Sequence, residues 1–99
     1  MSKEQSTGVN NTEPEGYNGW PNYETWLVNL WLDNDEHTYR HWRAEADKLS
    51  DWELARVLET AHKDTSYDLT GATGMWADLI GAALDRVDWR STANRLKEE

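Results

Sequence analysis

The sequence contains no cysteine and no phenylalanine, and only two prolines among its 99 residues. Without cysteine there is no disulfide, no thiolate metal ligand and no thiol nucleophile. The chain also has no apolar run approaching the roughly 18 residues of a membrane span. No apolar stretch follows a basic N-terminus, as it would in a signal peptide. We therefore expect a cytoplasmic protein that neither spans a membrane nor is secreted.

Basic residues are also few: 10 Lys and Arg stand against 19 Asp and Glu, which gives a net charge of -9. Proteins that bind nucleic acid normally present a basic face to the phosphate backbone. The charge therefore argues against direct nucleic-acid binding. The acidic residues are spread along both halves of the chain, which is typical of a soluble surface.

What the chain does have is tryptophan, seven residues of it. A chain of this length has room for one domain with one small core. Large indole rings are then a major source of apolar burial. Residues 1–16 hold almost no apolar side chain, so we expect a disordered tail there and a single helical domain over residues 17–99.

Helical spacing predicts five helical segments. Apolar residues recur at helical intervals after Asn22, after Asp35, after the capping-box pair Ser50 and Glu53, from Met75, and after Asp88. The expected inward positions are Tyr23, Trp26, Leu27, Leu30 and Trp31; Tyr39, Trp42, Ala46 and Leu49; Leu54, Leu58 and Ala61; Met75, Trp76, Leu79, Ile80, Ala83 and Leu84; and Trp89, Ala93 and Leu96.

Two of these segments carry more specific expectations. The third helix should fade near His62, because residues 63–74 are rich in Thr, Ser, Asp and Gly and favour a long ordered loop. The fourth helix is apolar enough to be the central and most buried one. No alternating strand pattern occurs, so the predicted fold class is all-α, a compact bundle of four to five short helices.

The stretch Gly19-Trp20-Pro21-Asn22-Tyr23-Glu24-Thr25-Trp26 resembles a motif close to Gly-Trp-x-Asn-Tyr-Glu-Thr-Trp. That motif opens a family of small, mostly uncharacterised proteins of phages, plasmids and prokaryotic chromosomes. The segment Val87-Asp88-Trp89-Arg90 is similar to the family's Val-Asn-Trp ending, with Asp88 in place of Asn. The resemblance implies a shared fold and no catalytic residues. Its mobile-element setting implies a protein that blocks a host defence or nucleic-acid enzyme.

Catalytic and metal sites find little support in the sequence. His37 and His41 have the i, i+4 spacing of two metal ligands, but exposed helix histidines are the simpler interpretation. No Gly-rich phosphate loop occurs, and no spacing brings a nucleophile, a base and oxyanion donors together. We therefore predict no enzyme activity, no metal and no cofactor.

The sequence favours a module that binds another protein, in its sharper form an inhibitor of a host nucleic-acid-binding protein. The acids Asp33, Asp35, Glu36, Asp47 and Asp51 would meet a basic groove, and Glu24 would be an outward-facing contact of the Asn22–Trp26 string. Trp20, Trp52 and Trp89, if half exposed, would serve as anchors. A purely structural role for the Asn22–Trp26 string competes with this interpretation. The alternative function is a self-associating structural or accessory protein.

Overall fold

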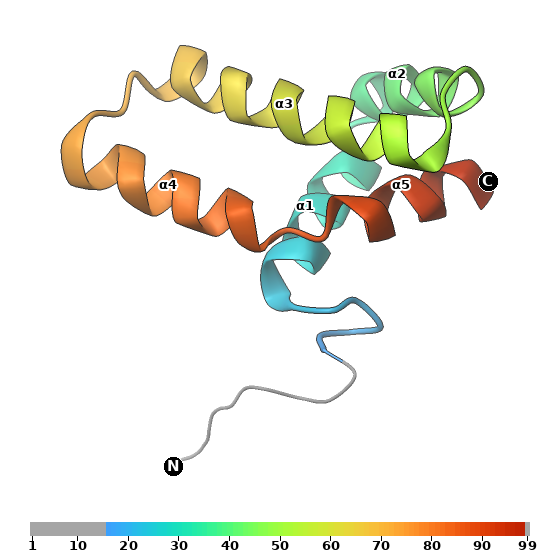
Figure 1. Cartoon of the computed structure of the whole chain (residues 1–99), viewed down its shortest axis with the longest axis horizontal. Coiled ribbons are helices and arrows are strands. Elements are labelled where there is room, and N and C mark those ends of the chain that lie inside the picture. The colour runs from blue at the N-terminus through green and yellow to red at the C-terminus, as the bar shows by residue number, and fades with distance from the viewer. Residues whose placement is uncertain (1–15, 99) are drawn as a thin grey trace.

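Five α-helices follow one another in the computed structural model, which describes residues 16–98 (Figure 1). They are α1 (Tyr23–Asn34), α2 (Glu36–Ala46), α3 (Asp51–Thr70), α4 (Gly74–Arg86) and α5 (Trp89–Glu98). The prediction of an all-α fold is thus confirmed. The predicted disordered tail lies outside the described residues except for Gly16, which packs against the backbone of Trp20 and Pro21.

The helices begin where the capping residues predict. The Asn22 side chain accepts a hydrogen bond from the Thr25 backbone N–H at 2.9 Å. Ser50 and Glu53 form the complete capping box that opens α3. The backbone N–H of Ser50 donates to the Glu53 carboxylate at 3.0 Å, and this bond holds the pKa of Glu53 below its ordinary value. These starts are local features, and the sequence is sufficient to locate them.

The third helix is longer than predicted. It continues to Thr70, so the expected loop over residues 63–74 is wrong. The hydroxyls that suggested a loop donate back to helix carbonyls instead: Ser66 Oγ lies 2.7 Å from the Lys63 oxygen, and Thr70 Oγ1 lies 2.7 Å from the Ser66 oxygen. The helix ends at Gly71, whose φ of 61° is the left-handed conformation that favours glycine.

The core lies between α3 and α5, which make the most extensive contact of any two helices. Leu54 and Leu58 of α3 pack there with Ala93 and Leu96 of α5. An aromatic stack continues this core: the His62 ring lies between Trp42 and Trp89, with ring centroids 5.8 and 5.2 Å away. The stack thereby joins α2, α3 and α5, which are far apart in the sequence.

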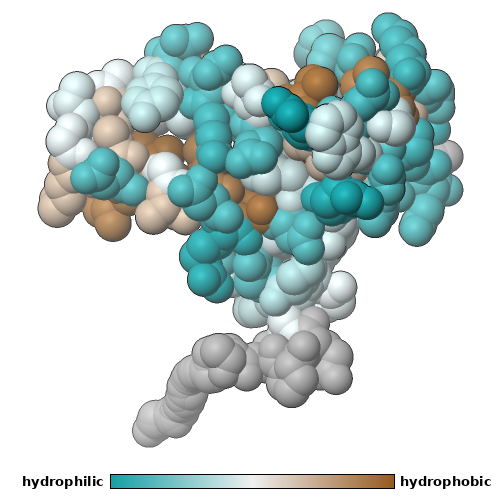
Figure 2. Space-filling model, in the orientation of Figure 1, coloured by the Kyte–Doolittle hydropathy of each residue, from teal (hydrophilic) through white to brown (hydrophobic). Residues whose placement is uncertain are grey.

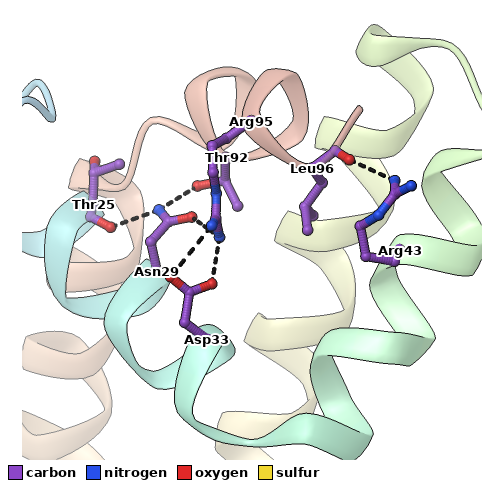
Figure 3. A network of polar contacts seen from close by, with 7 residues as sticks. All are labelled: Thr25, Asn29, Asp33, Arg43, Thr92, Arg95 and Leu96. Carbon is purple, nitrogen blue, oxygen red and sulfur yellow. Dashed lines mark hydrogen bonds and ion pairs between the residues drawn. The ribbon is translucent and has the colours of Figure 1, made fainter. Parts of the chain in front are cut away.

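The first helix does not bury the predicted stripe. Its buried residues are Thr25, Asn29 and Leu32, whereas Trp31 is 68% exposed and Tyr23 and Leu30 are also exposed. The reason is a buried polar network between α1 and α5 (Figure 3). Hydrogen bonds to specific partners turn the Thr25 and Asn29 face inward, although apolar periodicity predicts the other face.

This network connects the motif region to the C-terminal helix. Asn29 Nδ2 donates to the Thr25 carbonyl and to Thr92 Oγ1, both at 2.8 Å, and Asn29 Oδ1 accepts from Arg95 at 3.3 Å. Arg95 also forms an ion pair with Asp33 at 2.7 Å. Thr25 Oγ1 accepts from the Asp88 backbone N–H at 2.8 Å. These contacts therefore support the structural role of the Asn22–Trp26 string over a role as an outward-facing contact.

Candidate functional site

The most unusual surface belongs to α4 and the part of α3 beyond Leu58, which we call the arm. In Figure 1 the arm extends to one side of the body that α1, α2, α5 and the start of α3 form. No residue of α4 is buried, and Met75 and Trp76 are each 63% exposed. The prediction that this helix is the most buried one is therefore wrong. An apolar helix normally lies in a core, whereas this one has only α3 and α1 to pack against.

The arm is fastened mainly at its base. Asn22 Nδ2 donates to the Arg86 carbonyl at 2.7 Å, and Arg86 forms an ion pair with Glu24 at 3.1 Å. Beside this base, Lys63 of α3 contacts Asp85 of α4 at 2.7 Å and Glu59 at 2.8 Å. The hydrogen bonds that Lys63 Nζ donates to Asp85 and, secondly, to Glu59 raise the pKa of Lys63. Both cations of the arm thus have carboxylate partners within the chain.

One face of α4 is left without a partner. Met75, Leu79 and Ala83 recur at i, i+4 and i+8, with Trp76 beside them, and we call this set the outer stripe. All four side chains are exposed. Ala77, Ile80 and Leu84 on the other side of the helix turn toward α3. Figure 2 shows hydrophobic surface gathered over this end of the molecule. Sequence reasoning had placed all four residues of the outer stripe among the inward positions.

A groove of about 220 Å³ runs between α3 and α4. Tyr67 and Thr70 line it from α3, and Ile80, Gly81 and Leu84 line it from α4. A Cβ atom built on Gly81 would have no neighbour within 4 Å, so the groove is open above this glycine. The arm therefore offers an apolar helix face and a separate interhelical groove.

The predicted acidic contacts are mostly engaged within the chain. Five of the six form ion pairs: Glu24 with Arg86, Asp33 with Arg95, Glu36 with Arg40, Asp47 with Arg43 and Asp51 with Arg90. The sixth, Asp35, caps α2 by accepting from the Thr38 N–H, which holds its pKa below the ordinary value. These residues have structural partners, and a cluster at the α1–α2 junction is not an unoccupied acidic patch.

The three predicted tryptophan anchors have different surroundings. Trp89 is 6% exposed and stacks on His62, so its predicted inward position is confirmed and the condition for an anchor role, partial exposure, is not met. Trp20 is half-buried beneath the Arg95 guanidinium, 5.8 Å from its ring centre. Trp52 is 55% exposed, with Arg56 over its ring at 5.2 Å. No ring contact joins any two of them within residues 16–98.

Sequence reasoning missed the exposed side chains of the arm, chiefly Trp76 and Leu79. One signal in the sequence could have indicated this exposure. The apolar residues of the fourth helix cover more than one face, and a chain of this length has too few other helices to bury all of them. Among residues 16–98, no three His, Asp or Glu side chains come close enough to hold a metal ion. No helix in that part of the chain is long and apolar enough to cross a membrane.

These features define a small all-α protein with a buried polar network and a projecting helical arm. The chain belongs to the family of unknown function DUF7249, whose model matches residues 13–93. This match includes all of α1 to α4 and the first half of α5. No curated protein and no solved structure gives a significant match.

Proposed function

We propose that this is a non-enzymatic module that binds another protein through the arm. The observation that carries the proposal is that α4 buries none of its residues and leaves Trp76 and Leu79 more than half exposed. Exposed apolar patches of this kind mark interaction surfaces in soluble proteins, and tryptophan is enriched among the residues that dominate binding energy.

The size of the expected contribution follows from the exposed area. A tryptophan buries about 150–250 Å². Covering the exposed 63% of Trp76 would remove roughly 100–160 Å² from water, worth about 2.5–4 kcal/mol at ~25 cal/mol/Å². Even half of that energy changes a dissociation constant by about tenfold. One side chain of the outer stripe is thus enough to test the surface.

The acidic surface and the family resemblance support a narrower form of this proposal. The partner is a nucleic-acid-binding or defence protein of the host, met in the cytoplasm by a protein of mobile-element origin. The net charge of -9 would favour a basic partner and would make its association depend on salt. The arm replaces the α1–α2 junction as the proposed contact, because the acids there are already paired within the chain.

A matched pair of tryptophan variants tests the arm. Trp76→Ser removes an exposed indole from the outer stripe, and Trp52→Ser removes one of similar exposure from the start of α3. We expect a protein captured from nuclease-treated host lysate by the wild type and by Trp52→Ser to be absent with Trp76→Ser. Equal capture by both variants would contradict the proposal.

Self-association is the second candidate function, since the outer stripe could also pack against a second copy. Sedimentation velocity at micromolar concentration distinguishes the two. A stable dimer that Trp76→Ser converts to a monomer would establish self-association. A monomeric wild type would leave the arm free for a different protein.

A further inference from the structure

The first helix has an apolar face that the fold leaves uncovered. Tyr23, Leu27, Leu30 and Trp31 recur at i, i+4, i+7 and i+8, and we call this set the α1 stripe. Leu27 is half-buried, and the other three side chains are exposed. The buried polar network occupies the opposite side of α1 (Figure 3). Because an amphipathic helix normally buries its apolar side, this inversion leaves the α1 stripe available to another molecule.

The charges of α1 are already paired within the chain. Glu24 and Asp33 are the two charged residues of this helix. Glu24 pairs with Arg86 at 3.1 Å, and Asp33 pairs with Arg95 at 2.7 Å. A strongly charged partner would therefore find no unpaired charge on α1 to complement its own. Two copies, each with a net charge of -9, can meet through α1 without bringing unpaired acids of this helix together.

The α1 stripe is symmetric about its central leucine. Tyr23 and Trp31 each stand four residues from Leu27, which is about 6 Å along the helix axis. If two copies of α1 pack antiparallel about a two-fold axis at Leu27, each Tyr23 meets the Trp31 of the second copy. An interface of this kind uses the same patch on both molecules and must be complementary to itself. The order aromatic, leucine, aromatic meets that requirement.

We infer that the α1 stripe is the interface of an antiparallel homodimer, with a second copy of this chain as its occupant. Leu27 lies at the two-fold axis, and a Tyr23–Trp31 pair lies on each side of it. Aromatic pairs contribute stabilisation beyond the area that they bury. The inference goes beyond the proposed function, since it concerns α1 rather than the outer stripe of α4.

The exposed area predicts how tightly the two copies associate. A tyrosine or tryptophan buries about 150–250 Å². Covering the exposed 48% of Tyr23 and 68% of Trp31 would bury roughly 170–290 Å² per copy, or about 350–580 Å² in the dimer. Stable interfaces bury about 1,200–2,000 Å², so these two residues supply roughly a third of that area. Leu30 and Tyr17, which is also exposed and contacts Tyr23, extend the patch. We therefore expect a weak and reversible dimer.

Sedimentation equilibrium of the full chain, from about 5 to 500 µM, tests the interface. We expect a monomer–dimer equilibrium with a Kd of about 10–100 µM, typical of a small interface. Trp31→Ser and Tyr23→Ser should each weaken it at least tenfold. Trp52→Ser is the matched control, because it removes an indole of similar exposure from α3, and it should stay within about twofold of the wild type. Added salt should strengthen the dimer, since it screens the repulsion between two acidic chains.

A cysteine variant tests the antiparallel register. The chain has no cysteine, so Leu27→Cys introduces a single thiol. At the two-fold axis the two introduced thiols face each other, and a mild oxidant can join them in a disulfide. We expect a covalent dimer for Leu27→Cys and none for Trp52→Cys on a non-reducing gel. If Leu27→Cys fails to crosslink at a concentration where the wild type is dimeric, the proposed register is wrong.

Three outcomes of the sedimentation experiment would overturn the inference. The first is a wild type that remains monomeric at about 500 µM, and the second is a dimer that Trp31→Ser leaves intact. The third is a dimer that Trp76→Ser dissociates, which would move the interface to the outer stripe. The proposed function fails separately, because its test compares capture of a host protein by Trp76→Ser and Trp52→Ser. Equal capture by those two variants would contradict binding through the arm and leave the α1 dimer standing.

Discussion

Asn29→Ala tests the buried network that orients α1. Asn29 is 2% exposed, and its Nδ2 donates to the Thr25 carbonyl and to Thr92 Oγ1. The substitution removes both bonds and also the bond that Asn29 Oδ1 accepts from Arg95 at 3.3 Å. It leaves the Thr92 hydroxyl, which is fully buried, without this donor. Arg95 retains its two-pronged contact with Asp33 at 2.7 and 3.2 Å, so the ion pair survives.

The expected cost follows from these contacts. Each neutral hydrogen bond contributes about 1 kcal/mol net, and leaving a buried polar group unsatisfied costs about 1–3 kcal/mol. The two neutral bonds and the unsatisfied Thr92 hydroxyl together predict a loss of about 3–5 kcal/mol in the free energy of unfolding. For a domain of this size each kcal/mol lowers the Tm by roughly 4–8 °C.

Urea unfolding followed by far-UV circular dichroism measures this loss. Asn94→Ala is the control, because Asn94 is an exposed α5 residue and gains the same helix propensity on substitution. A double-mutant cycle with Thr92→Val isolates the Asn29–Thr92 bond, for which we expect a coupling energy of about 1–2 kcal/mol. A cost for Asn29→Ala no larger than that for Asn94→Ala, together with additive double mutants, would refute the structural role of the network.

Three further predictions concern other parts of the fold. Leu79→Ala should change the free energy of unfolding by less than about 0.5 kcal/mol, because the side chain is 54% exposed. Leu58→Ala, at a fully buried site, should cost about 2–5 kcal/mol in the same urea assay, and equal costs would contradict the placement of α4. The capping box should make the free energy of unfolding depend on pH. Because the pKa of Glu53 is lower in the folded state than its ordinary value of 4.5, the Glu53 carboxylate stabilises the fold above pH 4.5, and this stabilisation is lost as the pH falls below that value. Melting curves from neutral to acidic pH should therefore show a smaller acid-induced drop in Tm for Glu53→Gln than for the wild type. Lys63→Met should speed amide hydrogen exchange in α4 by up to about fivefold, since it removes the Lys63–Asp85 pair that joins α3 to α4 and is worth about 0.2–1 kcal/mol. Unchanged exchange would show that this pair does not hold the arm.

The sequence by itself determined the helices and most of their starts. Asn22, Asp35 and the Ser50–Glu53 pair act on backbone groups only three residues away, so their effect does not depend on the rest of the fold. The chain length, the net charge and the absence of cysteine were likewise known from the sequence without a structure. The end of α3 was mispredicted, because Ser66 and Thr70 can satisfy helix carbonyls as well as loop backbone.

Only the tertiary structure decided which faces are buried. The spacing of apolar residues predicts that a helix has an apolar stripe. Whether that stripe is buried depends on how much of it the neighbouring helices can cover. In α1 the partners Thr92 and Arg95, more than 60 residues away, draw the polar face of Asn29 inward. Only two helices, α3 and α1, contact α4, and Trp76 stays exposed. The candidate site lies on the arm for that physical reason: the chain has more apolar helix surface than its own core can enclose.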